Sequence, residues 1–137
     1  MRTHVEFRSA KFPSEEPDGE VNPGRWGIRL AQYLEANLPR HGVRPVGILT
    51  EDWGYLVPLE ADKFPISIAC GNYEEYSDGF LCFLKPSTPT IRRWFRTIDT
   101  APELGRVAEA LDALLTSDPD IYGVRWWTPE EGRYPGQ

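Results

Sequence analysis

The sequence lacks any apolar run near the length of about 20 residues that a membrane-spanning helix needs. Its first residues, from Met1 to Glu6, also lack the apolar segment of a secretory signal. These two absences lead us to expect a cytoplasmic protein that does not enter a membrane. With 137 residues the chain has the usual size of one domain, so we predict a single domain over residues 1–137.

Histidine and cysteine are scarce, with two of each. His4 and His41 have no helical spacing, and there is no C-x-x-C motif, so we predict no metal site. Cys70 and Cys82 lie in apolar runs typical of strands, which favours buried free thiols. Two cysteines alone do not make the disulfide framework of a small secreted protein. A cross-strand redox pair is the alternative to buried free thiols.

Motifs of the common enzyme classes are missing as well. The sequence has no G-x-S-x-G elbow, no Walker A loop and no G-x-G-x-x-G segment. We therefore predict no catalytic residue and no cofactor. Whether the protein is an enzyme stays open at this point, although these absences favour a non-enzymatic role.

Positive charge is limited. The net charge is −6, with 21 acidic and 15 basic residues, and only Lys11, Lys63 and Lys85 are lysines. Because phosphate contacts need clustered lysine and arginine, a nucleic-acid-binding surface is disfavoured. An acidic chain instead favours a partner with a basic surface.

Aromatic residues are plentiful at 12%, and the apolar pattern predicts an α+β fold. We expect a mostly antiparallel sheet of about five or six strands packed against two main helices and one short helix. The predicted strands are His4–Arg8, Val46–Leu49, Gly54–Leu59, Phe64–Cys70, Phe80–Leu84 and Ile121–Trp127. The strand around Cys82 is apolar on both faces and should be central.

The helices are predicted from caps and apolar spacing. The first should begin near Asn22 or Pro23 and end before Pro39. The short helix should begin at Thr88 and bury Ile91, Trp94, Phe95 and Ile98. The last should begin at a capping box of Thr100 and Glu103 and end at Asp118. Residues 13–24 are predicted to form a loop and residues 129–137 a frayed tail.

Acidic and aromatic residues alternate in two predicted loops, and interfaces favour tyrosine and tryptophan. We predict a binding surface there, formed by Glu51, Asp52, Trp53, Tyr55, Tyr73, Glu74, Glu75, Tyr76 and Asp78. Solvated acids and aromatic core lids are the alternative interpretation. The two loops could lie at opposite ends of the sheet or share one end. If the carboxylates meet, they could also bind a divalent ion or perform acid–base chemistry.

Three arginines surround two aromatic residues in the segment Arg92–Arg96. Arg92, Arg93 and Arg96 are candidate contacts for a phosphate or an acidic partner, because guanidinium groups bind planar anions well. The alternative is that they cap backbone carbonyls or pair with nearby acids.

Several segments resemble a family of small bacterial proteins with no assigned activity. The resemblance rests on an EDWG(W/Y) motif at Glu51–Tyr55, a CGxYEEYxDGFLCF segment at Cys70–Phe83 and the segment Arg92–Arg96. It extends from Val5 to Trp127. The resemblance implies a stand-alone cytoplasmic domain and assigns no functional residue.

Two functions are compatible with these observations. The first is a non-enzymatic protein that binds another protein, in an immunity-like or regulatory role, through its acidic and aromatic loops. The second is a small-molecule- or divalent-metal-binding enzyme that uses the loop carboxylates Glu51, Asp52, Glu74 and Asp78.

Overall fold

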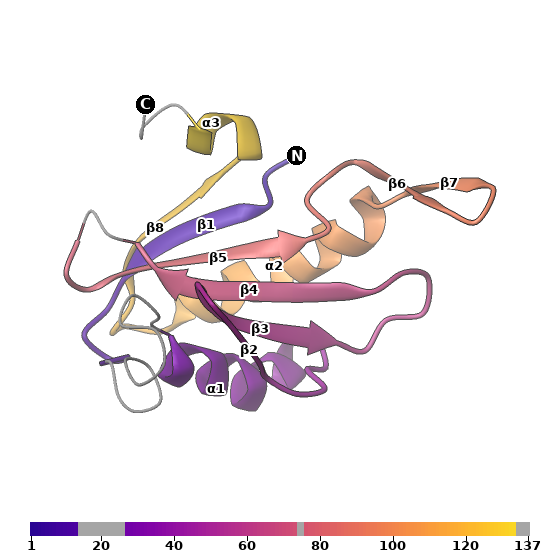
Figure 1. Cartoon of the computed structure of the whole chain (residues 1–137). Helices are drawn as coiled ribbons and strands as arrows, with labels where there is room; N and C mark the ends of the chain where they lie inside the picture. Colours follow the sequence, from indigo (N-terminus) through magenta and orange to yellow (C-terminus); the bar gives the residue numbers. More distant parts are fainter. Residues whose placement is uncertain (14–26, 74–75, 134–137) are drawn as a thin grey trace.

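The computed structural model describes residues 1–13, 27–73 and 76–133 (Figure 1). Its main sheet has six antiparallel strands in the order β2-β3-β4-β5-β1-β8. The strands are β1 His4–Arg8, β2 Leu49–Glu51, β3 Gly54–Leu59, β4 Ile66–Asn72, β5 Gly79–Lys85 and β8 Tyr122–Trp127. The predicted α+β class with an antiparallel sheet is confirmed, and β5 lies between β4 and β1 inside the sheet.

The helices and a short second sheet complete the fold. The helical elements are α1 Ile28–Asn37, the 3-10 turn η1 Leu38–His41, α2 Ala101–Ser117 and α3 Pro129–Arg133. The second sheet is the hairpin of β6 Thr90–Arg93 and β7 Arg96–Asp99, which projects from one end of the main sheet (Figure 1). In the described part of the chain, no helix is both long and apolar enough to cross a membrane.

Both long helices pack on one face of the main sheet, and strand alternation explains which residues form the core. Side chains on successive strand residues point to opposite faces. Val5, Phe7 and Leu84 therefore face the helices and are at most 1% exposed. On the helix side, Leu30 and Leu34 of α1 and Leu111 of α2 are fully buried against them. This amphipathic spacing is the pattern that predicted both helices.

The predicted short helix at Thr88 is wrong. Residues Thr90–Arg93 and Arg96–Asp99 form a hairpin in which Ile91 pairs with Ile98 across the strands. Both isoleucines pack against the core, so the hairpin buries the same apolar pair that a helix would have buried. The local pattern therefore did not distinguish the two structures. The short helix of this fold is α3, in a segment that the sequence predicted to be frayed.

Three further predictions concern element ends. The strand predicted at Val46–Leu49 begins instead at Leu49. Helix α2 does begin after Thr100, but the predicted capping box is wrong, because the Thr100 hydroxyl donates to the Thr88 carbonyl and makes no cap hydrogen bond. Asp99 Oδ1 accepts from the Ala101 N–H at 3.0 Å instead. The predicted helix start at Asn22 or Pro23 lies outside the described residues.

The two cysteines face each other in the core, which confirms that they are buried and free. Cys70 of β4 pairs directly with Cys82 of β5, and their sulfur atoms lie 3.9 Å apart. Their mutual hydrogen bond, together with burial, raises the pKa of the Cys82 thiol. A thiol held protonated in this way is a small core residue rather than a nucleophile.

Candidate functional site

The two acidic and aromatic loops lie at the same end of the main sheet. The β2–β3 turn carries Asp52 and Trp53, and β3 starts beside the end of β4, since Tyr55 pairs with Cys70. The β4–β5 connection, with Tyr76 and Asp78, leaves from that same end (Figure 1). Of the two arrangements left open by the sequence, the structure has the shared end. Glu74 and Glu75 lie outside the described residues.

Asp78 is the centre of an interaction network at this end. Its carboxylate accepts from the Tyr122 hydroxyl at 2.5 Å and from the Arg8 Nε at 2.8 Å. The Tyr122 hydrogen bond, followed by the Arg8 hydrogen bond, lowers the pKa of Asp78. The Arg8 guanidinium also lies over the ring of Tyr76, 4.2 Å from its centroid. The ring centroids of Tyr76 and Tyr73 are 6.3 Å apart.

Sequence reasoning missed Arg8 and Tyr122 as parts of this end. Both lie in strands, β1 and β8, which are distant from the loop in sequence but adjacent in the sheet. The strand order that brings them to Asp78 carries no local sequence signal. Asp78 is therefore held by two residues of the sheet, and its charge is balanced by Arg8.

A row of aromatic rings crosses the face of the sheet opposite α1 and α2. His4 stacks on Phe83 with ring centroids 4.9 Å apart and on Trp127 at 4.6 Å. Trp53 extends the row, since its ring lies 5.9 Å from that of Phe83. We call these four residues the aromatic row. They come from the β2–β3 turn and three strands, so only the folded sheet assembles them.

The aromatic row is accessible at its Trp53 end and closed at its Trp127 end. Trp53 is 41% exposed, whereas Trp127 is 9% exposed. Burial lowers the pKa of His4, whereas the charge of Glu130 opposes this shift. Because the lowering is the larger effect, the imidazole is neutral at neutral pH. The Trp53 end therefore offers an accessible aromatic surface to another molecule.

A shallow hollow of about 270 Å³ lies at the accessible end of the row. It is lined by Trp53, Gly71, Asn72, Leu81 and Phe83. Apolar side chains form most of its wall, and Asn72 adds one amide. Gly71 leaves space at its base, because a Cβ there would come within 3.3 Å of the Trp53 carbonyl. A planar or apolar side chain of a partner could stack in this hollow.

Tyr55 was predicted to lie on the binding surface, but the structure places it in the core. The residue is 1% exposed. The physical reason is strand alternation: Tyr55 pairs with Cys70 and faces the helices, on the opposite side of the sheet from the aromatic row. The other described residues of the predicted surface, Glu51, Asp52, Trp53, Tyr73, Tyr76 and Asp78, lie at this end of the sheet and are at least partly exposed.

The three arginines proposed as anion contacts are separate from this end. Arg92, Arg93 and Arg96 lie on the β6–β7 hairpin, at the opposite end of the sheet (Figure 1). Arg93 caps a backbone carbonyl, that of Lys63, at 3.2 Å. In the described residues, no carboxylate forms an ion pair with any of the three arginines.

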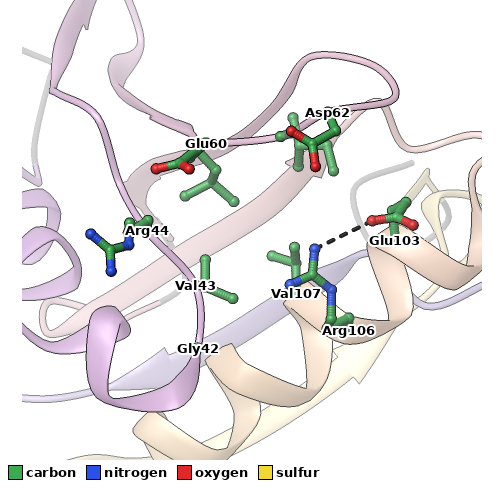
Figure 2. A pocket seen from close by; sticks show the side chains of 11 residues that line it. Gly42, Val43, Arg44, Glu60, Asp62, Glu103, Arg106 and Val107 are labelled. Atoms are coloured by element: carbon green, nitrogen blue, oxygen red, sulfur yellow. Dashed lines mark hydrogen bonds and ion pairs between the residues drawn. The ribbon is translucent and has the colours of Figure 1, made fainter.

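A second hollow, of about 200 Å³, lies between α2 and the β3–β4 connection (Figure 2). Glu60 and Asp62 line one rim, and Glu103 and Arg106 of α2 line the other. Glu103 is paired with Arg106 at 3.3 Å and with Lys63 at 3.4 Å, and these contacts lower its pKa. This hollow has charges of both signs on its rim and no exposed aromatic residue in its lining, so it is a weaker candidate for contact with an apolar side chain of a partner.

Metal binding receives no support within the part of the chain that the structure describes. No three histidine, cysteine, aspartate or glutamate side chains there are grouped so that they could hold an ion. The carboxylate of Asp78, one of the four proposed for acid–base or metal chemistry, is held by Arg8 and Tyr122.

Comparisons with known proteins identify no relative: no family model, no curated sequence and no solved structure matches this chain. The geometry of the aromatic row and its hollow is therefore the basis for assigning a function.

Proposed function

We propose that the chain is a non-enzymatic protein-binding domain whose binding surface is the accessible end of the aromatic row. The partner is a protein that inserts an apolar or aromatic side chain into the hollow and presents basic residues around it. An immunity-like or regulatory role, and the expected location in the bacterial cytoplasm, belong to the same proposal.

The observation that supports the proposal is an exposed tryptophan above an apolar hollow. Trp53 is 41% exposed and covers a space lined by Leu81 and Phe83, on a face where neither long helix packs. Tryptophan and tyrosine are enriched at interfaces, and hot spots sit in pockets of this kind. Tyr76, also 41% exposed, adds a second aromatic ring at the same end.

The charge at this end supports a basic partner. Glu51, Asp52 and Asp78 lie there, Asp78 is paired with Arg8, and the whole chain carries −6. Complementary charge speeds encounter and selects partners, and its effect falls with salt.

The proposal is tested by placing a photo-crosslinking phenylalanine analogue at Phe83 in cells of the source organism. A protein adduct is expected, because position 83 lines the hollow. The same analogue in place of Ala113, which is exposed on α2, is the control and should give no such adduct. Identical products from both positions, or none from position 83, would contradict the assignment of this surface.

A matched pair of substitutions separates surface contact from charge. Leu81→Lys and Ala113→Lys each add one positive charge, but only the first enters the hollow. Leu81→Lys should reduce capture of the partner by about tenfold or more, as expected at the centre of an interface. Ala113→Lys should leave it unchanged, and the wild-type adduct should weaken as salt rises.

A further inference from the structure

The β6–β7 hairpin has the two most exposed aromatic residues in the described part of the chain at its tip. Trp94 is 85% exposed and Phe95 is 95% exposed. They form the two-residue turn between β6 and β7, and Arg93 and Arg96 are paired directly behind them. Figure 1 shows the hairpin extending away from the main sheet, beyond the ends of its strands.

The tip has three features that oppose the stability of an isolated hairpin. Trp94 has φ 60°, a left-handed conformation that side chains other than glycine and asparagine adopt at a cost. Arg93 faces Arg96 across the strands, and like charges in that position repel. Two large aromatic side chains are in water. Within the described residues no carboxylate compensates for the arginines.

The opposite end of the same chain has the complementary chemistry. It carries the apolar hollow under Trp53 and the acidic residues Glu51, Asp52 and Asp78, the last of which is paired with Arg8. Because the hairpin and the hollow are at opposite ends of the main sheet, the tip of one molecule cannot reach its own hollow (Figure 1). A second copy of the chain can bring the two together.

We infer that the hairpin of one copy docks on the aromatic row of a second copy, with Trp94 or Phe95 in the hollow. This inference rests on the proposed function, because it uses the same surface and names one occupant of it. Arg92, Arg93 and Arg96 then face the acidic end, so association weakens with salt. The hairpin of a second copy thus competes with any other protein partner for that surface.

The contact joins two different surfaces, so it is heterologous. Each copy bound at its acidic end still has a free hairpin, and head-to-tail contacts of this type produce rings or open chains. A small protruding hairpin buries little area, so the association belongs to the weak, transient class. Wild-type protein should form a concentration-dependent series of oligomers at low salt.

Two variants that each lack one half of the contact provide the test. Trp94→Gly with Phe95→Ser removes the aromatic tip, and glycine then occupies the left-handed position. Trp53→Lys with Leu81→Lys fills the hollow with positive charge. Sedimentation velocity measures each variant alone and the 1:1 mixture, at about 50 mM and about 500 mM salt.

The expected result is that each variant alone is monomeric, while the mixture forms a species of about twice the monomer mass and nothing larger. The mixture stops there because only one functional hairpin and one functional hollow remain. High salt should dissociate it. Monomeric wild-type protein at every concentration, or a mixture that does not associate, overturns the inference.

A second measurement is needed if circular dichroism shows that the variant Trp53→Lys with Leu81→Lys is unfolded. Arg93→Glu with Arg96→Glu, which leaves the hollow intact, is then measured alone, and it should be monomeric at low salt at concentrations where the wild-type protein forms oligomers. Failure of self-association with a retained adduct at position 83 would reject this inference alone. Self-association without any other partner at position 83 would reject the proposed function alone.

Discussion

The main sheet and the β6–β7 hairpin are both antiparallel, but the chain uses them differently. In the main sheet, alternate residues such as Val57, Ile68 and Leu84 are fully buried against the helices. In the hairpin, only Ile91 and Ile98 are partly buried, and the other residues are exposed. Folding therefore constrains nearly every second residue of the main sheet and only two residues of the hairpin.

This difference indicates which residues contribute to binding rather than to folding. Arg8 in the main sheet is paired with Asp78 and lies over the ring of Tyr76, so its charge has partners within the fold. The hairpin arginines lack such partners among the described residues, and their neighbours Trp94 and Phe95 are in water. Substitutions on the helix-facing side of the main sheet should therefore change stability, whereas substitutions at the hairpin tip should change association.

The largest expected effect compares two neighbours in β5. Leu84 is fully buried, and Leu84→Ala should lower the free energy of unfolding by about 2–5 kcal/mol because it leaves a cavity. Phe83 faces the other side, partly exposed, and Phe83→Ala should cost less than half as much. Urea unfolding followed by circular dichroism measures both. Equal losses would mean that the face of the aromatic row is also covered.

A smaller effect is expected at Gly54, where β3 passes close to β4. A Cβ at this position would lie 2.2 Å from the Cys70 carbonyl oxygen, and a backbone atom cannot move aside cheaply. Gly54→Ala should cost about 1–3 kcal/mol. The matched control is Gly105→Ala in α2, where no atom lies within 4 Å of the new Cβ. It should stabilise the protein by about 0.5–1 kcal/mol, since alanine favours helix.

The next effect depends on pH. Partial burial opposes ionisation of Asp118, but hydrogen bonds from Lys11, from the Asp120 backbone and from Tyr33 lower its pKa from 3.8 to about 2. A lowered pKa stabilises the fold above 3.8, and this contribution disappears as the pH falls towards 2. Solvent around Lys11, which is 37% exposed, should keep the effect below that of Gly54→Ala.

Asp118→Asn should therefore be less stable than wild type at pH 7, and the difference should shrink as the pH falls from about 4 to about 2. Urea unfolding at several pH values measures the difference. The control Asp62→Asn removes an exposed carboxylate and should leave the pH profile close to that of wild type. If the difference in stability between Asp118→Asn and wild type stays constant with pH, the ionised carboxylate is not its cause.

The smallest effect on stability is expected at the hairpin tip. Trp94→Gly removes a side chain that is 85% exposed and relieves its left-handed backbone, so unfolding should change by less than about 1 kcal/mol, towards greater stability. Thermal unfolding measures this at a low protein concentration. A clear loss of stability would show that Trp94 has a role in folding, and the contrast between hairpin and main sheet would fail.

Much of the fold could be predicted because its signals are local. β1 and β3 were predicted with their observed bounds, and the apolar stripe of α2 gave its buried face. Its start was predicted correctly after Thr100, although the capping box used for that prediction is not formed. The hairpin was mistaken for a helix because Ile91 and Ile98 satisfy both structures. Trp53 was predicted as a site residue from its loop, whereas Phe83 and His4 have no local feature that would mark them.

The sequence by itself determined the six strands of the main sheet and the two long helices, which side of each is apolar, and which loops carry acidic and aromatic residues. It did not determine that residues 90–99 form a hairpin. Tertiary structure decided the strand order, which places β1 between β5 and β8. That order brings His4 between Phe83 and Trp127, and Arg8 beside Asp78. The physical reason is that spacing along the chain specifies the face of a residue, whereas its neighbours on that face depend on pairing between distant strands.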